Sequence, residues 1–129
     1  MGQRVLTGIA GTRLAPAGLE WDTIKVSHYY ALQALERLVR PGSVAVDPAP
    51  AEPALYFFVP PGTTKEWDVA HSTALGIATH VVLPPNDKTL PPGPYWLITP
   101  RNGRLQHTQA AALRLALEAE SQPIPERAS

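Results

Sequence analysis

The tripeptide Glu-Trp-Asp occurs twice in the sequence, and a histidine follows each copy. The two copies end at Asp22 and Asp68, and the histidines are His28 and His71. Carboxylate and imidazole groups held together can transfer protons or bind a metal ion, so these four side chains are candidates for one polar cluster. The Asp-to-His spacing differs between the copies, which favours coincidence. An enzyme built on this cluster is therefore the least favoured of three hypotheses for this chain.

Other catalytic and metal-binding patterns are missing from the sequence. It contains no cysteine, and none of its four histidines has HxH or HxxxH spacing. Asp47 follows a candidate strand but has no second carboxylate nearby to help hold Mg²⁺, and the following Pro48 favours a turn. Neither the GxSxG nucleophile motif nor a glycine-rich phosphate loop is present. The sequence therefore predicts no catalytic residues, no metal site and no cofactor, and we expect a protein that is not an enzyme.

Four aromatic residues are candidates for a binding surface, because they fall at the ends of predicted elements or in loops: Trp21, Trp67, Tyr95 and Trp96. Tyr95 and Trp96 are neighbours in a predicted strand, so one ring should face the core and the other should face away. An outward ring beside a proline-rich loop is typical of a partner surface. The competing interpretation is that both rings cap the core.

Composition narrows the possible partners. Lys plus Arg and Asp plus Glu each number 11, so the formal net charge is zero. Proteins that grip nucleic acid through its phosphates usually carry a basic excess, so nucleic acid is possible but not favoured. Zero net charge gives little repulsion between copies, and we expect a homodimer or a protein partner on a surface that includes Tyr95 or Trp96.

Hydropathy and residue usage suggest where the protein works. No apolar run approaches the ~18 residues of a membrane helix, so we expect no membrane contact and a cytoplasmic location. Arg outnumbers Lys, and Ala and Pro are abundant. This usage is typical of a GC-rich genome such as that of an actinobacterium.

The length of 129 residues fits one domain, and the prolines and glycines divide it into elements. We expect a flexible arm over 1–18, a single domain over 19–120 and a flexible tail over 121–129. The expected strands are 43–46, 55–59, 77–83 and 95–99, with a short strand or extended lead-in at 21–26, and the expected helices are 28–40 and 109–120. Strands that follow one another directly predict an α+β fold, with a small mixed or mostly antiparallel sheet packed against two helices.

Apolar spacing predicts which helix faces meet the sheet. In helix 28–40 the stripe comprises Ala31, Leu32, Leu35, Leu38 and Val39, at i, i+3 and i+4 spacing. In helix 109–120, Ala110, Leu113 and Leu117 should face the core. The segment between 63 and 73 is polar and predicts a loop with one helical turn around Trp67.

Four stretches resemble the second half of the N-terminal domain of bifunctional DNA primase–polymerases: Leu55–Gly62, Leu75–Gly76, Thr79–Pro85 and Pro92–Leu97. The resemblance implies a nucleotidyl-transfer type of fold. The acidic metal-binding pair of that family is missing, because Val44–Pro48 holds a single Asp. Its Gly-Gly-x-His stretch is replaced by Ala51–Ala54. The resemblance therefore implies a truncated, non-catalytic relative, as in short actinobacterial proteins.

Two functional hypotheses remain ahead of the enzyme. The first is a non-catalytic binding or regulatory module that acts through protein–protein contacts. The alternative is a nucleic-acid or nucleotide binder that retains a primase-like shape without the catalytic metal ligands.

Overall fold

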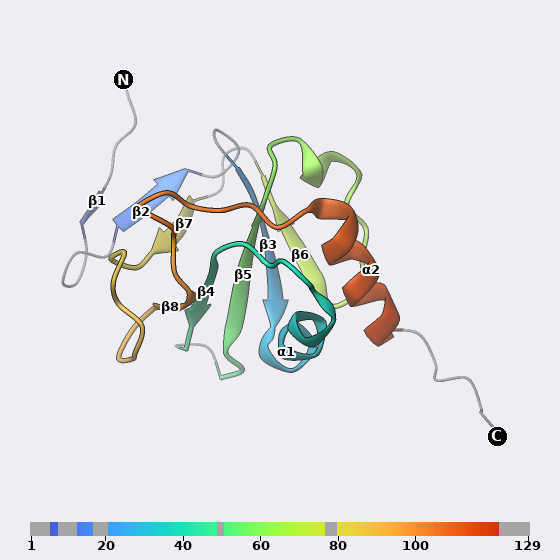
Figure 1. Ribbon diagram of the computed structural model, residues 1–129, viewed down its shortest axis with the longest axis horizontal. Helices are drawn as coiled ribbons and strands as arrows, with labels where there is room; N and C mark the ends of the chain where they lie inside the picture. Colours follow the sequence, from blue (N-terminus) through green and yellow to red (C-terminus); the bar gives the residue numbers. More distant parts are fainter. Residues whose placement is uncertain (1–5, 8–12, 17–20, 49–50, 77–79, 122–129) are drawn as a thin grey trace.

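The computed structural model describes residues 6–7, 13–16, 21–48, 51–76 and 80–121 (Figure 1). These residues form an α+β fold with a five-stranded antiparallel sheet, a three-stranded sheet and two α-helices, which confirms the predicted fold class. In chain order the elements are β1 (Leu6–Thr7), β2 (Arg13–Pro16), β3 (Asp22–Ser27), α1 (His28–Arg37), β4 (Val44–Asp47), β5 (Ala54–Val59), the 3-10 helix η2 (Thr63–Glu66), β6 (Ser72–Leu75), β7 (His80–Leu83), β8 (Tyr95–Ile98) and α2 (Ala110–Ser121).

The larger sheet has the strand order β6-β3-β5-β4-β8, and each neighbouring pair is antiparallel. β5 lies at its centre and carries the sequence ALYFFV. Leu55, Phe57, Phe58 and Val59 of this strand are all buried, as expected for an apolar run covered on both sides. The prediction of a buried strand here is confirmed.

Both helices lie over one face of this sheet (Figure 1). Phe57 is fully buried in the resulting core, and Leu35 of α1 packs against the same core while half-buried. The predicted contact of the first helix with the strand is thus confirmed. The buried members of this core are Ile24, Val26, Ala31, Ala34, Leu38, Val44, Val46, Leu55, Phe57, Val59, Val69, Leu113, Ala116 and Leu117.

A second, smaller core lies on the opposite face of the sheet. Phe58 and Trp96 form its centre, together with Ala45 and with Leu83 from β7 of the three-stranded sheet β1-β2-β7. The rings of Phe58 and Trp96 are 5.9 Å apart, and Trp21 meets Phe58 edge-on at 6.0 Å. The main sheet therefore separates a helical core from an aromatic one.

The first helix ends three residues earlier than predicted. Leu38 follows the last helical residue, Arg37, and adopts an extended conformation with φ −83° and ψ 126°, although its N–H still donates to the Ala34 carbonyl. Pro41 disfavours a helical conformation at the residue before it, and the chain must then turn into β4. Because Val39 lies beyond the helix, it is 91% exposed instead of facing the core.

Within α1, the apolar stripe also differs from the prediction. Leu32 is exposed, and Ala34 is fully buried in its place. Small alanines at 31 and 34 let the helix lie close to the sheet, and larger neighbours at the edge of the stripe remain partly outside. In α2, Leu113 and Leu117 are buried as predicted, Ala110 is half-buried, and Ala116 joins the core.

Other element boundaries agree within a residue or two, and two strands were missed, namely β2 inside the expected arm and β6. β6 begins at Ser72, inside the segment that was expected to be a loop, and the helical turn there is η2, just before Trp67. Of the strand expected at 77–83, residues 77–79 lie outside the described residues. Of the expected arm, the structure describes only β1 and β2, and residues 122–129 of the expected tail also lie outside the described residues.

Candidate functional site

The structure places the four predicted polar residues in different surroundings. Asp22 is 2% exposed, and its Oδ2 accepts hydrogen bonds from the backbone N–H and the hydroxyl of Thr64, both at 2.9 Å. His28 begins α1, at the opposite end of β3 from Asp22. Its side chain is exposed. Asp22 and His28 are therefore not brought together.

The second pair is also engaged elsewhere. Asp68 forms a 2.8 Å ion pair with Arg114 of α2. His71 stacks on the ring of Tyr30, with 3.9 Å between the ring centres and 11° between the planes. Within the described part of the chain, no group of three or more His, Asp or Glu residues is placed to hold a metal ion.

The candidate aromatic residues cap the two cores. Trp96 is 1% exposed, and its Nε1–H donates to the Pro84 carbonyl at 3.2 Å. Tyr95 packs against the helical core while half-buried, and Trp21 packs on the aromatic core. Trp67 donates from Nε1 to the Ser72 hydroxyl at 2.8 Å. The surface that was expected at Trp96 is therefore interior, in agreement with the competing interpretation.

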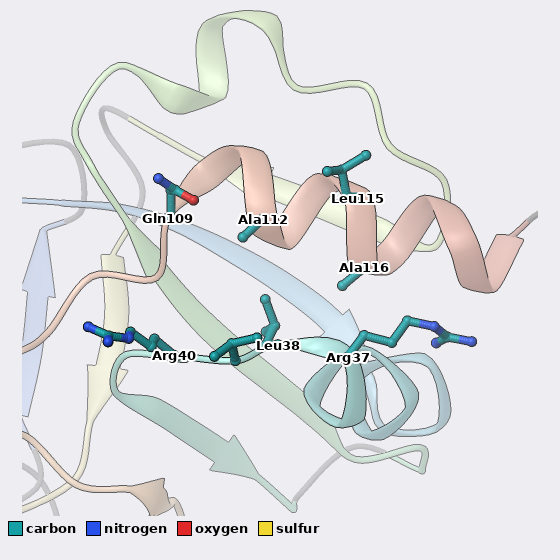
Figure 2. Close-up of a pocket in the computed structure, with 8 residues that line it drawn as sticks. Arg37, Leu38, Arg40, Gln109, Ala112, Leu115 and Ala116 are labelled. Atoms are coloured by element: carbon teal, nitrogen blue, oxygen red, sulfur yellow. The ribbon is translucent and has the colours of Figure 1, made fainter.

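An open groove that the sequence analysis missed lies between the end of α1 and α2 (Figure 2). Its volume is about 650 Å³, which falls within the range of ligand and peptide sites. The described residues that line it are Arg37, Leu38, Val39, Arg40, Gln109, Ala112, Leu115 and Ala116.

The local sequence explains why the groove exists. The early end of α1 leaves Leu38 in an extended conformation, and residues 38–40 line one side of the groove opposite α2. On the facing side of α2, Ala112 and Ala116 are one helical turn apart and have methyl side chains only. Ala116 and Leu38 are themselves buried, so they form an apolar floor.

The walls of the groove expose apolar side chains to solvent. Val39 is 91% exposed and Leu115 is 67% exposed. Among the described residues, six large hydrophobic side chains are exposed, and four of them belong to α1, to the residues after it or to α2: Tyr29, Leu32, Val39 and Leu115. Exposed apolar side chains are thus concentrated on the helical layer, which is typical of an interaction surface.

Two guanidinium groups frame this apolar floor. Figure 2 shows Arg37 and Arg40 extending toward opposite ends of the groove, with Leu38 between them. None of the eight described lining residues is acidic. Arg37 also donates to the Gln33 carbonyl of its own helix at 3.2 Å. The groove is therefore complementary to an apolar group or segment that carries carboxylates.

A smaller hollow of about 450 Å³ lies on the other side of α2, beside η2. Two cationic residues line it, Lys65 and Arg114. Arg114 pairs with Asp68 and with Glu118, each through a guanidinium nitrogen within 2.9 Å of a carboxylate oxygen. The hydrogen bond to Asp68, followed by the one to Glu118, raises the pKa of Arg114. This arrangement fastens the 66–68 segment to α2.

The groove has a signal in the sequence. Over its twelve residues, AAALRLALEAES, α2 carries only three charged residues: Arg114, Glu118 and Glu120. A helix that is apolar on more than one side is usually covered on more than one side. This apolar excess, together with the two arginines at and just after the end of α1, is the sequence signal that could have indicated the groove.

A scan against models of known protein families finds no match for this chain, and searches of curated proteins and of solved structures find none either. Among the described residues, none of the helices has the length and apolar character needed to cross a bilayer.

Proposed function

We propose that this protein is a non-catalytic binding module that acts through protein–protein contacts, and that the groove between α1 and α2 is its binding site. The observation that carries the proposal is the combination of an apolar floor with two arginines and no acidic lining residue among those described. The resemblance to primase–polymerases remains a prediction and does not enter this proposal.

The groove chemistry favours a protein segment over nucleic acid. Binding energy at protein interfaces is concentrated in desolvated apolar anchors, with arginine among the residues that contribute most. Val39 and Leu115 would become buried beneath such a segment, and Arg37 and Arg40 would pair with its carboxylates. Nucleic acid would offer phosphates to the two arginines but would leave Val39 and Leu115 without apolar contacts.

A random peptide library displayed on phage tests this function. The protein is immobilised at low density, so that copies do not meet one another. We expect the enriched peptides to combine large apolar residues with Asp or Glu, and to lose binding to the double variant Arg37→Glu, Arg40→Glu. The matched control is Arg101→Glu, Arg104→Glu, which makes the same charge change in an exposed turn and should bind as the wild type does.

Two outcomes would contradict the proposal. One is the absence of any enriched sequence. The other is enrichment that survives both the Arg37/Arg40 reversal and Leu115→Glu. Labelled single-stranded DNA serves as the competing probe, and tight DNA binding that weakens steeply with added salt would favour the nucleic-acid alternative instead.

A further inference from the structure

The outward side of α2 carries a ridge without charge. Ala111, Leu115 and Ala119 follow one another at intervals of four residues, and all three are exposed. Residues with this spacing lie above one another on a helix. The structure describes two charged side chains of α2, Arg114 and Glu118. Arg114 forms ion pairs with Glu118 and with Asp68. A partner that covered this ridge would remove Leu115 from water, and burying such a side chain is favourable.

Leu115 belongs both to this ridge and to the wall of the groove. Leu115 lines the groove and also projects from α2 into solvent, as Figure 2 shows. Beside it, Ala112 and Ala116 leave the hollow that a projecting side chain can fill. In a two-fold symmetric dimer the same surface of each copy meets the other. Leu115 of each copy could then pack over Ala112 and Ala116 of the other copy.

We propose that the groove is occupied by α2 of a second copy of this chain, packed antiparallel to form a symmetric homodimer. This inference rests on the proposed function, since it names the partner of the same site. The four-residue ridges of two such helices can interdigitate, which is the commonest mode of helix packing. Val39 and Leu115, the two most exposed apolar side chains of the groove, would both become buried.

The charge of Arg40 agrees with an antiparallel arrangement. Arg40 lies at the same end of the groove as Gln109, which is at the N-terminal end of α2 (Figure 2). An antiparallel α2 from the second copy places its C-terminal end there. That end carries the partial negative charge of free carbonyl groups. The formal net charge of zero adds no long-range repulsion between the copies.

Sedimentation velocity over micromolar to millimolar concentrations tests the dimer. We expect a species of twice the 13.9 kDa chain mass. Leu115→Glu places a carboxylate on the exposed ridge, where it should not disturb folding, and should raise the dimer dissociation constant by roughly a hundredfold. The double variant Arg101→Glu, Arg104→Glu is the control and should still form the dimer.

Cross-linking then identifies the surface. The chain has no cysteine, so Leu115→Cys introduces a single thiol near the proposed two-fold axis and should form a disulfide-linked dimer under mild oxidation. Leu90→Cys is the matched control, because Leu90 is also well exposed (71%) but lies in the loop before β8. It should remain largely uncross-linked.

A wild type that stays monomeric throughout would overturn the homodimer, and so would a dimer that Leu115→Glu leaves intact. Neither result touches the proposed function, because the peptide library is read on isolated copies. Conversely, a dimer sensitive to Leu115→Glu with no enriched peptides would show a groove that serves self-association alone.

Discussion

The carboxylate of Asp22 accepts two hydrogen bonds from Thr64, a residue 42 positions later in the chain. One comes from the backbone N–H at the start of η2 and the other from the hydroxyl. This pair fastens η2 to the first residue of β3, and the carboxylate is 2% exposed.

Replacing Asp22 with Ala should lower the free energy of unfolding by about 1–3 kcal/mol, because two donors of Thr64 lose their shared acceptor in a partly buried place. Asp22→Asn keeps a carbonyl oxygen and should cost less. Chemical denaturation measures both. Equal stability of the Ala variant and the wild type would show that the contact contributes nothing to folding.

Truncating side chains of the helical core to alanine should lower the free energy of unfolding by an amount that depends on how deeply each side chain is buried. Phe57→Ala should cost about 3–5 kcal/mol, since Phe57 is 0% exposed at the centre of the sheet. Leu35→Ala should cost less, roughly 1–3 kcal/mol, because its side chain is only half-buried against the same core. Thermal and urea unfolding give both values. Equal losses for the two variants would contradict the described packing of α1.

Stability should also fall in strongly alkaline solution because of Tyr56. Burial, followed by the negative charge of Asp47, raises the pKa of Tyr56 above its ordinary value of 10.0. Above pH 10 the unfolded chain loses this proton while the folded protein still holds it, so the free energy of unfolding decreases as the pH rises through the raised pKa.

Tyr56→Phe removes this titration and should flatten that part of the decline. Asp47→Asn should reduce it only partly, because burial is the larger cause. Urea unfolding of the wild type, Tyr56→Phe and Asp47→Asn below and above pH 10 measures the difference. Lysine side chains also titrate in this range, but they do so equally in all three proteins and cancel in the comparison. A decline in Tyr56→Phe as steep as in the wild type would rule out this origin.

The fold class was predictable because β5 and both helices carry strong local patterns. LYFFV predicts a buried strand by composition alone, and the apolar spacing of α1 and α2 marks their inner faces. β6 was missed because STAL is short, polar at its start and stabilised chiefly by pairing with β3, which local sequence does not reveal. The end of α1 was placed late because Leu38 and Val39 continue the apolar spacing beyond the last helical residue.

The groove was harder to find from sequence than the fold. It depends on how far α1 extends and on which side of α2 meets it, and both are tertiary facts. Trp96 was predicted to be part of a binding surface because it is a large aromatic residue, but a large aromatic side chain is as typical of a core as of a binding surface. Val39 and Leu115, by contrast, look like ordinary core residues until the two helices are placed.

The strand order has a consequence for the speed of folding. β3 pairs with β5 and β6, and each of these pairings spans more than twenty residues of chain. Within the described five-stranded sheet, β4 and β5 are the only paired strands that are close in sequence. Because distant pairings must close long loops before they gain stability, we expect the β4–β5 hairpin to nucleate the sheet and β3 to join later. Folding in milliseconds to seconds, rather than microseconds, is the expected rate for such high contact order.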